Sequence, residues 1–154
     1  MNFGDWIGPF LFEKLSGRSA IYSNAKKRSV GTVYFSVGSI LHHIKCPDIA
    51  VIWGSGAMFS DRTFAKPRLT TAVRGPVTKK LFERQGFECP EVYGDPGLLM
   101  PHYINVEQGR SATLGIVPHL VDFERARVLF NDIDDVTVID VTGDMEAVIR
   151  SIGQ

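Results

Sequence analysis

The chain has 154 residues, of which 44% are hydrophobic and 22% charged, a composition typical of a globular protein with a real core. Its 17 acidic and 17 basic residues cancel, which argues against a nucleic-acid partner, because such a partner needs a basic surface. The apolar stretch over residues 6–15 is interrupted by Gly8, Pro9, Glu13 and Lys14, which argues against a signal peptide and a membrane span. We therefore expect a cytoplasmic protein.

Strands and helices are expected to alternate along the chain, because short apolar runs predict strands and Pro, Gly or Asp residues mark helix ends. The expected elements are a helix over 5–15 capped by Asp5, a strand over 32–37, a short helix over 38–43, buried strands over 49–53 and 69–73, a helix over 76–85 closed by Gly86, a strand over 91–93, a strand over 113–117, a helix from its cap Asp122 to 130, a strand over 136–141 and a helix over 144–149. This order predicts an α/β fold with a doubly wound, Rossmann-like parallel sheet and flanking helices.

The polar segment 101–111 is the best candidate for a linker. It separates an amino-terminal Rossmann-like domain, residues 1–100, from the start of a second Rossmann-like domain, residues 112–154. About four strand–helix units precede the linker and about two follow it, so the second domain is expected to be incomplete. Its short sheet would leave an open edge and an apolar face, which we expect to pack on the first sheet or on another copy of the chain.

The two cysteines, Cys46 and Cys89, are each followed by proline and lack the spacing of a metal site. Two free thiols in a reducing cytosol are the simpler interpretation, and a disulfide is the alternative. The rest of the sequence contains no cluster of metal-ligand type, so we expect neither a metal nor a cofactor.

Four glycine-bearing turns follow predicted strands, and the carboxyl ends of parallel strands meet at one edge of a sheet. The turns are Gly38-Ser39, Gly54-Ser55-Gly56, Arg74-Gly75-Pro76 and Gly94-Asp95-Pro96. A tight turn and a ligand cradle are both compatible with the Gly-x-Gly sequence, which lacks the third glycine of the dinucleotide motif. Arg74 is the more specific feature, since it lies between a strand and the first residue of a helix. Helix amino ends favour anions and a guanidinium matches a carboxylate or phosphate, so we expect an anion at Arg74 and Gly75.

Two other places have both a structural and a functional interpretation. Asp5 is expected to cap its helix, and the alternative is that Asn2 and Asp5 point into the ligand crevice and bind sugar hydroxyls, with Gly4 between them as a further substrate contact. His119 follows the strand over 113–117 and is either an ordinary loop histidine or a group that transfers a proton.

Six short motifs follow one another along nearly the whole chain. They are Asn2-Phe3-Gly4-Asp5, Gly38-Ser39-Ile40-Leu41, Val51-Ile52-Trp53-Gly54-Ser55-Gly56, Val73-Arg74-Gly75-Pro76-Val77-Thr78, Tyr93-Gly94-Asp95-Pro96 and Gly115-Ile116-Val117-Pro118-His119. In this order they resemble bacterial polysaccharide pyruvyl transferases, most closely the exopolysaccharide, succinoglycan-type branch. The resemblance implies two Rossmann-like halves similar to glycosyltransferases of the B type. It also implies the transfer of pyruvate from phosphoenolpyruvate to two hydroxyls of one sugar, as a cyclic ketal.

The resemblance also implies partners and residue roles. The partners are phosphoenolpyruvate and a saccharide acceptor, in an exopolysaccharide or its lipid-linked precursor. Arg74 matches the family's arginine after the third strand and is the expected anion anchor. The neighbouring glycine turns and the first motif supply further substrate contacts, and His119 is the candidate catalytic residue.

In the family, the second half continues to a Ser-Ser-x-His-Gly-like segment that supplies a further histidine, and this chain reaches Gln154 before any such segment. The resemblance therefore implies that transfer by these 154 residues is impaired. The alternative function is a non-catalytic α/β module, or an inactive fragment, that binds an anionic metabolite or a partner through the same sheet edge. A third alternative is nucleotide-sugar binding, as in glycosyltransferases of the B type.

Overall fold

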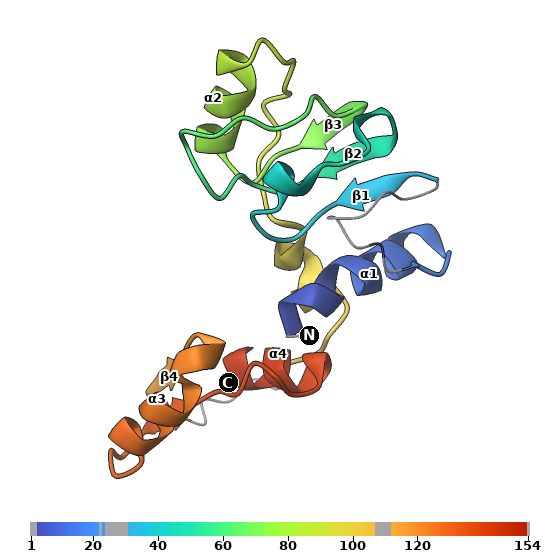
Figure 1. Ribbon diagram of the computed structural model, residues 1–154. Helices are drawn as coiled ribbons and strands as arrows, with labels where there is room; N and C mark the ends of the chain where they lie inside the picture. The colour runs from blue at the N-terminus through green and yellow to red at the C-terminus, as the bar shows by residue number, and fades with distance from the viewer. Residues whose placement is uncertain (1–2, 22, 24–30, 107–111, 154) are drawn as a thin grey trace. The chain divides into compact units, whose positions relative to one another are not determined.

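The structure is a computed structural model that describes residues 3–21, 23, 31–106 and 112–153 (Figure 1). The chain divides into two compact units, a larger one formed by Gly8–Leu98 and a smaller one formed by Met1–Ile7 together with Leu99–Gln154. Residues 107–111 of the predicted linker lie outside the described residues. Each unit is an α/β structure with a small parallel sheet and flanking helices.

The larger unit is built on a three-stranded parallel sheet with the strand order β1-β2-β3. The strands are β1 (Val33–Phe35), β2 (Ala50–Trp53) and β3 (Leu69–Ala72). In Figure 1 the three arrows point in one direction, as the pairing of Val33 with Ala50 and of Val51 with Leu69 requires. The strand expected over 91–93 is reduced to one parallel bridge between Val73 and Tyr93.

The connections between these strands contain less helix than the sequence predicts. The helical segments are α1 (Phe3–Ser16), the 3-10 turns η1 (Leu41–His43) and η2 (Pro47–Ile49), α2 (Pro76–Arg84) and the 3-10 helix η3 (Pro96–His102). Between β1 and β2 the described chain forms only the two short 3-10 turns, and between β2 and β3 it forms a loop. The α-helical connection of this unit is therefore α2, which leads from β3 to Tyr93, the residue bridged in parallel to Val73.

Both ends of α2 follow from local sequence. Pro76 occupies the first helical position, where its fixed φ is favourable and its missing N–H costs nothing. At the other end Gly86 has a φ of 71°, in the left-handed region. The Gly86 N–H donates to the carbonyl oxygen of Glu83 and the Phe87 N–H to that of Phe82, both at 2.9 Å, which is the Schellman pattern of helix closure. The prediction that Gly86 closes the helix is confirmed.

The core of the larger unit joins the sheet to α2. Phe35, Ile52 and Val73 from the sheet region share one buried cluster with Leu81 and Phe82 of α2. Phe82 is fully buried and also contacts an aromatic neighbour in the loop before β3, since its ring centroid lies 4.8 Å from that of Phe64. This cluster fixes α2, and with it the turn that precedes α2, against the sheet.

The two strands that were expected to be buried, β2 and β3, differ in their exposure to solvent. The central strand β2 has a neighbour on each side and is buried over Ala50–Ile52, as predicted. In β3 exposed and partly buried residues alternate, and Leu69 is 48% exposed, so the prediction of a buried strand is wrong there. Leu69 and Thr71 lie on the same face of the strand, and it is this face that is exposed.

The smaller unit contains a strand–helix–strand arrangement and a last helix. Its elements are β4 (Leu114–Ile116), the 3-10 turn η4 (Leu120–Asp122), α3 (Phe123–Phe130), β5 (Val136–Val138) and α4 (Met145–Gly153), with β4 and β5 parallel. Asp144 caps α4, because its Oδ1 accepts a hydrogen bond from the Ala147 N–H at 3.1 Å. Asp122 precedes α3 but makes no capping bond, so that prediction is wrong. Instead, Nδ1 of His119 accepts from the Val121 N–H at 3.3 Å and caps the preceding turn η4.

The expected cap of α1 is also wrong. The helix begins at Phe3, so Asp5 lies in its first turn and not at the capping position. The Phe3 N–H donates to the carbonyl oxygen of Val141 at 3.0 Å, and this tertiary bond satisfies the amide at the start of the helix. A carboxylate in the first turn remains favourable because it faces the positive end of the helix dipole.

We expect Phe82→Ala to lower the free energy of unfolding by about 3–5 kcal/mol, because it removes a fully buried ring from the core that holds α2. Denaturation with urea, followed by circular dichroism, measures the change. Lys80→Ala on an exposed position of the same helix is the control and should change stability by less than about 0.5 kcal/mol. Equal effects of the two substitutions would contradict the placement of α2.

Candidate functional site

The turns that follow the three strands of the larger unit are joined by hydrogen bonds at the carboxyl edge of the sheet. The carbonyl oxygen of Gly38, after β1, accepts from the Gly56 N–H and from the Ser55 hydroxyl, each at 2.9 Å. The Arg74 N–H, after β3, donates to the Ser55 carbonyl oxygen at 3.3 Å. The structure therefore brings together turns that lie up to 36 residues apart in the sequence, from 38 to 74.

The fourth turn packs directly against Gly54. This glycine has a φ of 92°, and a Cβ there would lie 2.3 Å from Cδ of Pro96 and 2.8 Å from the carbonyl oxygen of Gly94. The Gly54 N–H donates to the Ala72 carbonyl oxygen at 2.9 Å. Glycine is thus required here by the backbone and by the close approach of another turn.

The predicted ligand contacts at Gly54, Ser55 and Gly56 have partners inside the fold. Ser55 is fully buried with its hydroxyl bonded to Gly38, and the amides of the two glycines donate to backbone carbonyl oxygens. These three residues shape the sheet edge, where the two glycine amides and the Ser55 hydroxyl are used within the fold.

Arg74 is exposed, and two neighbours fix its guanidinium. Its Nη1 donates to the Ser39 hydroxyl oxygen at 2.6 Å. A Cβ at Gly56 would lie 2.7 Å from Cζ, Nε and Nη2 of Arg74, so the guanidinium occupies the space that a side chain at 56 would need. The sequence did not predict the contact between Ser39 and Arg74, because the two residues are 35 positions apart. The only local signal was Gly38, beside Ser39, which suggested a turn.

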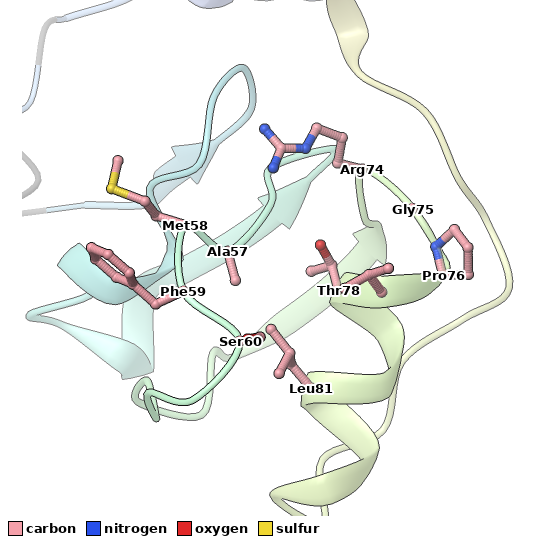
Figure 2. Close-up of a pocket in the computed structure, with 10 residues that line it drawn as sticks. Ala57, Met58, Phe59, Ser60, Arg74, Gly75, Pro76, Thr78 and Leu81 are labelled. Carbon is pink, nitrogen blue, oxygen red and sulfur yellow. The ribbon is translucent and has the colours of Figure 1, made fainter.

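A pocket of about 300 Å³ opens beside Arg74 (Figure 2). The residues that line it are Ala57, Met58, Phe59, Ser60, Arg74, Gly75, Pro76, Val77, Thr78 and Leu81. One wall is the first turn of α2 with the residues before it, and the opposite wall is the mainly apolar segment after β2. Among the residues predicted to bind ligand, Arg74 and Gly75 line this pocket.

The amino end of α2 faces the pocket without a cap. Gly75 stands at the capping position in an extended conformation and has no side chain to accept a bond. The first backbone bond of the helix joins the Lys79 N–H to the Gly75 carbonyl oxygen at 3.2 Å. Within the described residues, the amides of Val77 and Thr78 therefore have no hydrogen-bond partner. An uncapped helix end of this kind favours an anion.

Lys79, the next cation on α2, is already paired. Its Nζ lies 2.5 Å from a carboxylate oxygen of Glu83 and 3.2 Å from one of Glu91. The hydrogen bond to Glu83, followed by that to Glu91, raises the pKa of Lys79 above its ordinary value. Because these carboxylates neutralise Lys79, Arg74 supplies the positive charge at the pocket.

The remaining predicted site residues belong to the smaller unit. His119 is exposed and caps η4, and Gly4 and Asp5 lie in the first turn of α1. Asn2 lies outside the described residues. A common site for these residues and Arg74 stays a prediction.

No protein-family model, curated protein or solved structure matches this chain. The resemblance to pyruvyl transferases therefore rests on the six motifs. Over the described ranges, no group of three or more His, Cys, Asp or Glu side chains could hold a metal ion. In the same part of the chain, no helix has both the length and the apolar character needed to cross a membrane.

We expect Gly56→Ala to displace the Arg74 guanidinium while changing the free energy of unfolding by less than about 1 kcal/mol, because only the end of a flexible side chain must move. The Arg74 Nε resonance in a nitrogen–proton NMR spectrum and thermal unfolding measure the two effects. Gly143→Ala, where a Cβ would make ordinary contacts of 3.6 Å with Val148, is the matched control. An Arg74 resonance that is unchanged in Gly56→Ala would refute this packing.

Proposed function

We propose that the pocket binds phosphoenolpyruvate and that the chain is a polysaccharide pyruvyl transferase-like protein, which transfers pyruvate to a sugar as a cyclic ketal. The observation that carries the proposal is the Arg74 guanidinium, held by Ser39 over Gly56 beside the uncapped end of α2. The order of the six motifs supports it. The proposal extends to the architecture, with two Rossmann-like halves arranged as in glycosyltransferases of the B type.

The pocket offers what phosphoenolpyruvate needs. This ligand carries a carboxylate and a phosphate on a small apolar enol, so its site must combine several N–H donors with an apolar wall. One guanidinium N–H of Arg74 donates to the Ser39 hydroxyl oxygen, and the other guanidinium N–H groups are available for an anion. The amides of α2 add donors, and Ala57, Met58 and Leu81 line the pocket with apolar surface.

The proposed reaction begins with protonation of the enol methylene carbon, which leaves a cationic centre on the adjacent carbon. One sugar hydroxyl attacks this centre and loses its proton to a base. The second hydroxyl of the same sugar then displaces phosphate, its proton passes to the departing phosphate, and the ketal closes. We propose His119 as the proton donor, since an imidazole is suited to proton transfer near neutral pH.

A second candidate function is favoured by one observation. Every residue that lines the pocket belongs to the larger unit. Binding of an anionic metabolite through this edge therefore needs no residue of the smaller unit, and a non-catalytic module would use the same contacts.

We expect Arg74→Ala to weaken phosphoenolpyruvate binding about 10- to 100-fold, the effect of losing a hydrogen bond to a charged group. Isothermal titration calorimetry at two salt concentrations measures it. Arg68→Ala removes the same charge at another exposed position of the larger unit and should leave the affinity nearly unchanged. Equal affinities of the two variants would remove Arg74 from the site.

Release of inorganic phosphate from phosphoenolpyruvate in the presence of saccharides separates the two candidate functions. A transferase should release phosphate only when an acceptor is added, and His119→Ala should slow release without changing the calorimetric affinity. Binding without release in a panel of mono- and oligosaccharides, including lipid-linked ones, would favour the non-catalytic module.

A further inference from the structure

Thr78 is a largely buried residue whose hydroxyl makes no hydrogen bond within the described residues. Ser55 and Thr78 are the two buried polar residues among those described, and Thr78 is 5% exposed. The Ser55 hydroxyl donates to Gly38, whereas no hydrogen bond to the Thr78 hydroxyl exists within the described residues. Among the described residues, the side-chain atoms that are fully buried without a partner are the two ring nitrogens of His42, so the Thr78 hydroxyl is open to the pocket although the rest of its side chain is buried. A hydroxyl in this position can donate to a ligand in the pocket without first breaking a bond inside the protein.

The position of Thr78 indicates where that partner would be. Thr78 is the third residue of α2 and lines the pocket. Figure 2 shows its oxygen on the pocket side of the helix, pointing toward the end where the Arg74 guanidinium lies. In a helix a threonine hydroxyl often bonds to the carbonyl oxygen four residues earlier, but here the Arg74 carbonyl oxygen is not its partner.

We propose that the Thr78 hydroxyl donates a hydrogen bond to the phosphoryl group of the ligand. This inference rests on the proposed function and adds a binding residue to it. The phosphoryl group would accept from this hydroxyl and from the free amides of Val77 and Thr78, in the manner of phosphates at helix amino ends. The carboxylate is then left for the guanidinium of Arg74.

The assignment of the two anionic groups has a consequence for simpler ligands. Inorganic phosphate should depend on Thr78, because it can occupy only the phosphoryl position. Pyruvate should depend on Arg74 and be indifferent to Thr78, because it carries only the carboxylate. Phosphoenolpyruvate should depend on both residues.

Thr78→Val tests the inference, because valine fills nearly the same volume without the hydroxyl. We expect it to weaken binding of phosphoenolpyruvate and inorganic phosphate about tenfold and to leave pyruvate unchanged. Thr78→Ser should restore affinity to within about twofold of the original protein, since it keeps the hydroxyl. Calorimetry with each of the three ligands measures these differences.

Thermal unfolding supplies the readout that separates binding from structure. Because the Thr78 hydroxyl has no partner in the free protein, Thr78→Val should not lower the unfolding temperature. The control is Thr71→Val, whose hydroxyl donates to the Ile52 carbonyl oxygen at 2.9 Å, and it should leave all three affinities unchanged.

The failures of the two proposals are distinguishable. If Thr78→Val binds phosphate and phosphoenolpyruvate as tightly as the original protein while Arg74→Ala does not, the role of Thr78 is overturned and the proposed function stands. If Thr78→Val loses stability and affinity together and Thr78→Ser does not restore the affinity, the hydroxyl is structural and the inference also fails. If the original protein does not bind phosphoenolpyruvate, both proposals fail.

Discussion

The carbonyl oxygen of Gly38 accepts hydrogen bonds from both the Gly56 amide and the Ser55 hydroxyl, and the geometry of the pocket depends on this shared acceptor. It ties the turn after β1 to the turn after β2, and the Ser55 carbonyl oxygen then receives the Arg74 amide after β3. Parallel pairing brings the three strand ends to one edge, and these bonds fix the backbone there. Loss of the Gly38 contact would therefore move Ser39, and with it the oxygen that holds the Arg74 side chain.

The donors at this edge fall into two groups. In the glycine turn after β2, the amides of Gly54 and Gly56 and the Ser55 hydroxyl are used inside the fold, which makes that turn a scaffold. Those of Arg74 and of the first turn of α2, including the Thr78 hydroxyl, are not fully used and line the pocket. A Gly-x-Gly sequence after a strand thus contributes here by permitting close approach, while the adjacent arginine turn presents the charge. The chemistry of the site is concentrated in a short stretch, Arg74 to Thr78.

The sequence predicted best the features that depend on neighbours along the chain. The ends of α2 follow from Pro76 and Gly86, and the buried central strand β2 follows from an uninterrupted apolar run. The cap expected at Asp5 failed because a distant carbonyl oxygen, that of Val141, satisfies the helix start instead. The pairing of Ser39 with Arg74 has no local signature, since it depends on how two strands align in the sheet.

The uncapped amino end of α2 also couples ligand to fold. A helix whose capping residue is glycine is less stable by roughly a few tenths of a kcal/mol than one capped by a polar side chain. An anion seated on the Val77 and Thr78 amides would act as that cap, so the native state gains stability in proportion to the logarithm of free ligand concentration. The melting temperature of the larger unit should therefore rise when the pocket is occupied. Screening small anionic metabolites by melting shift would rank candidates without any prior assumption about the reaction.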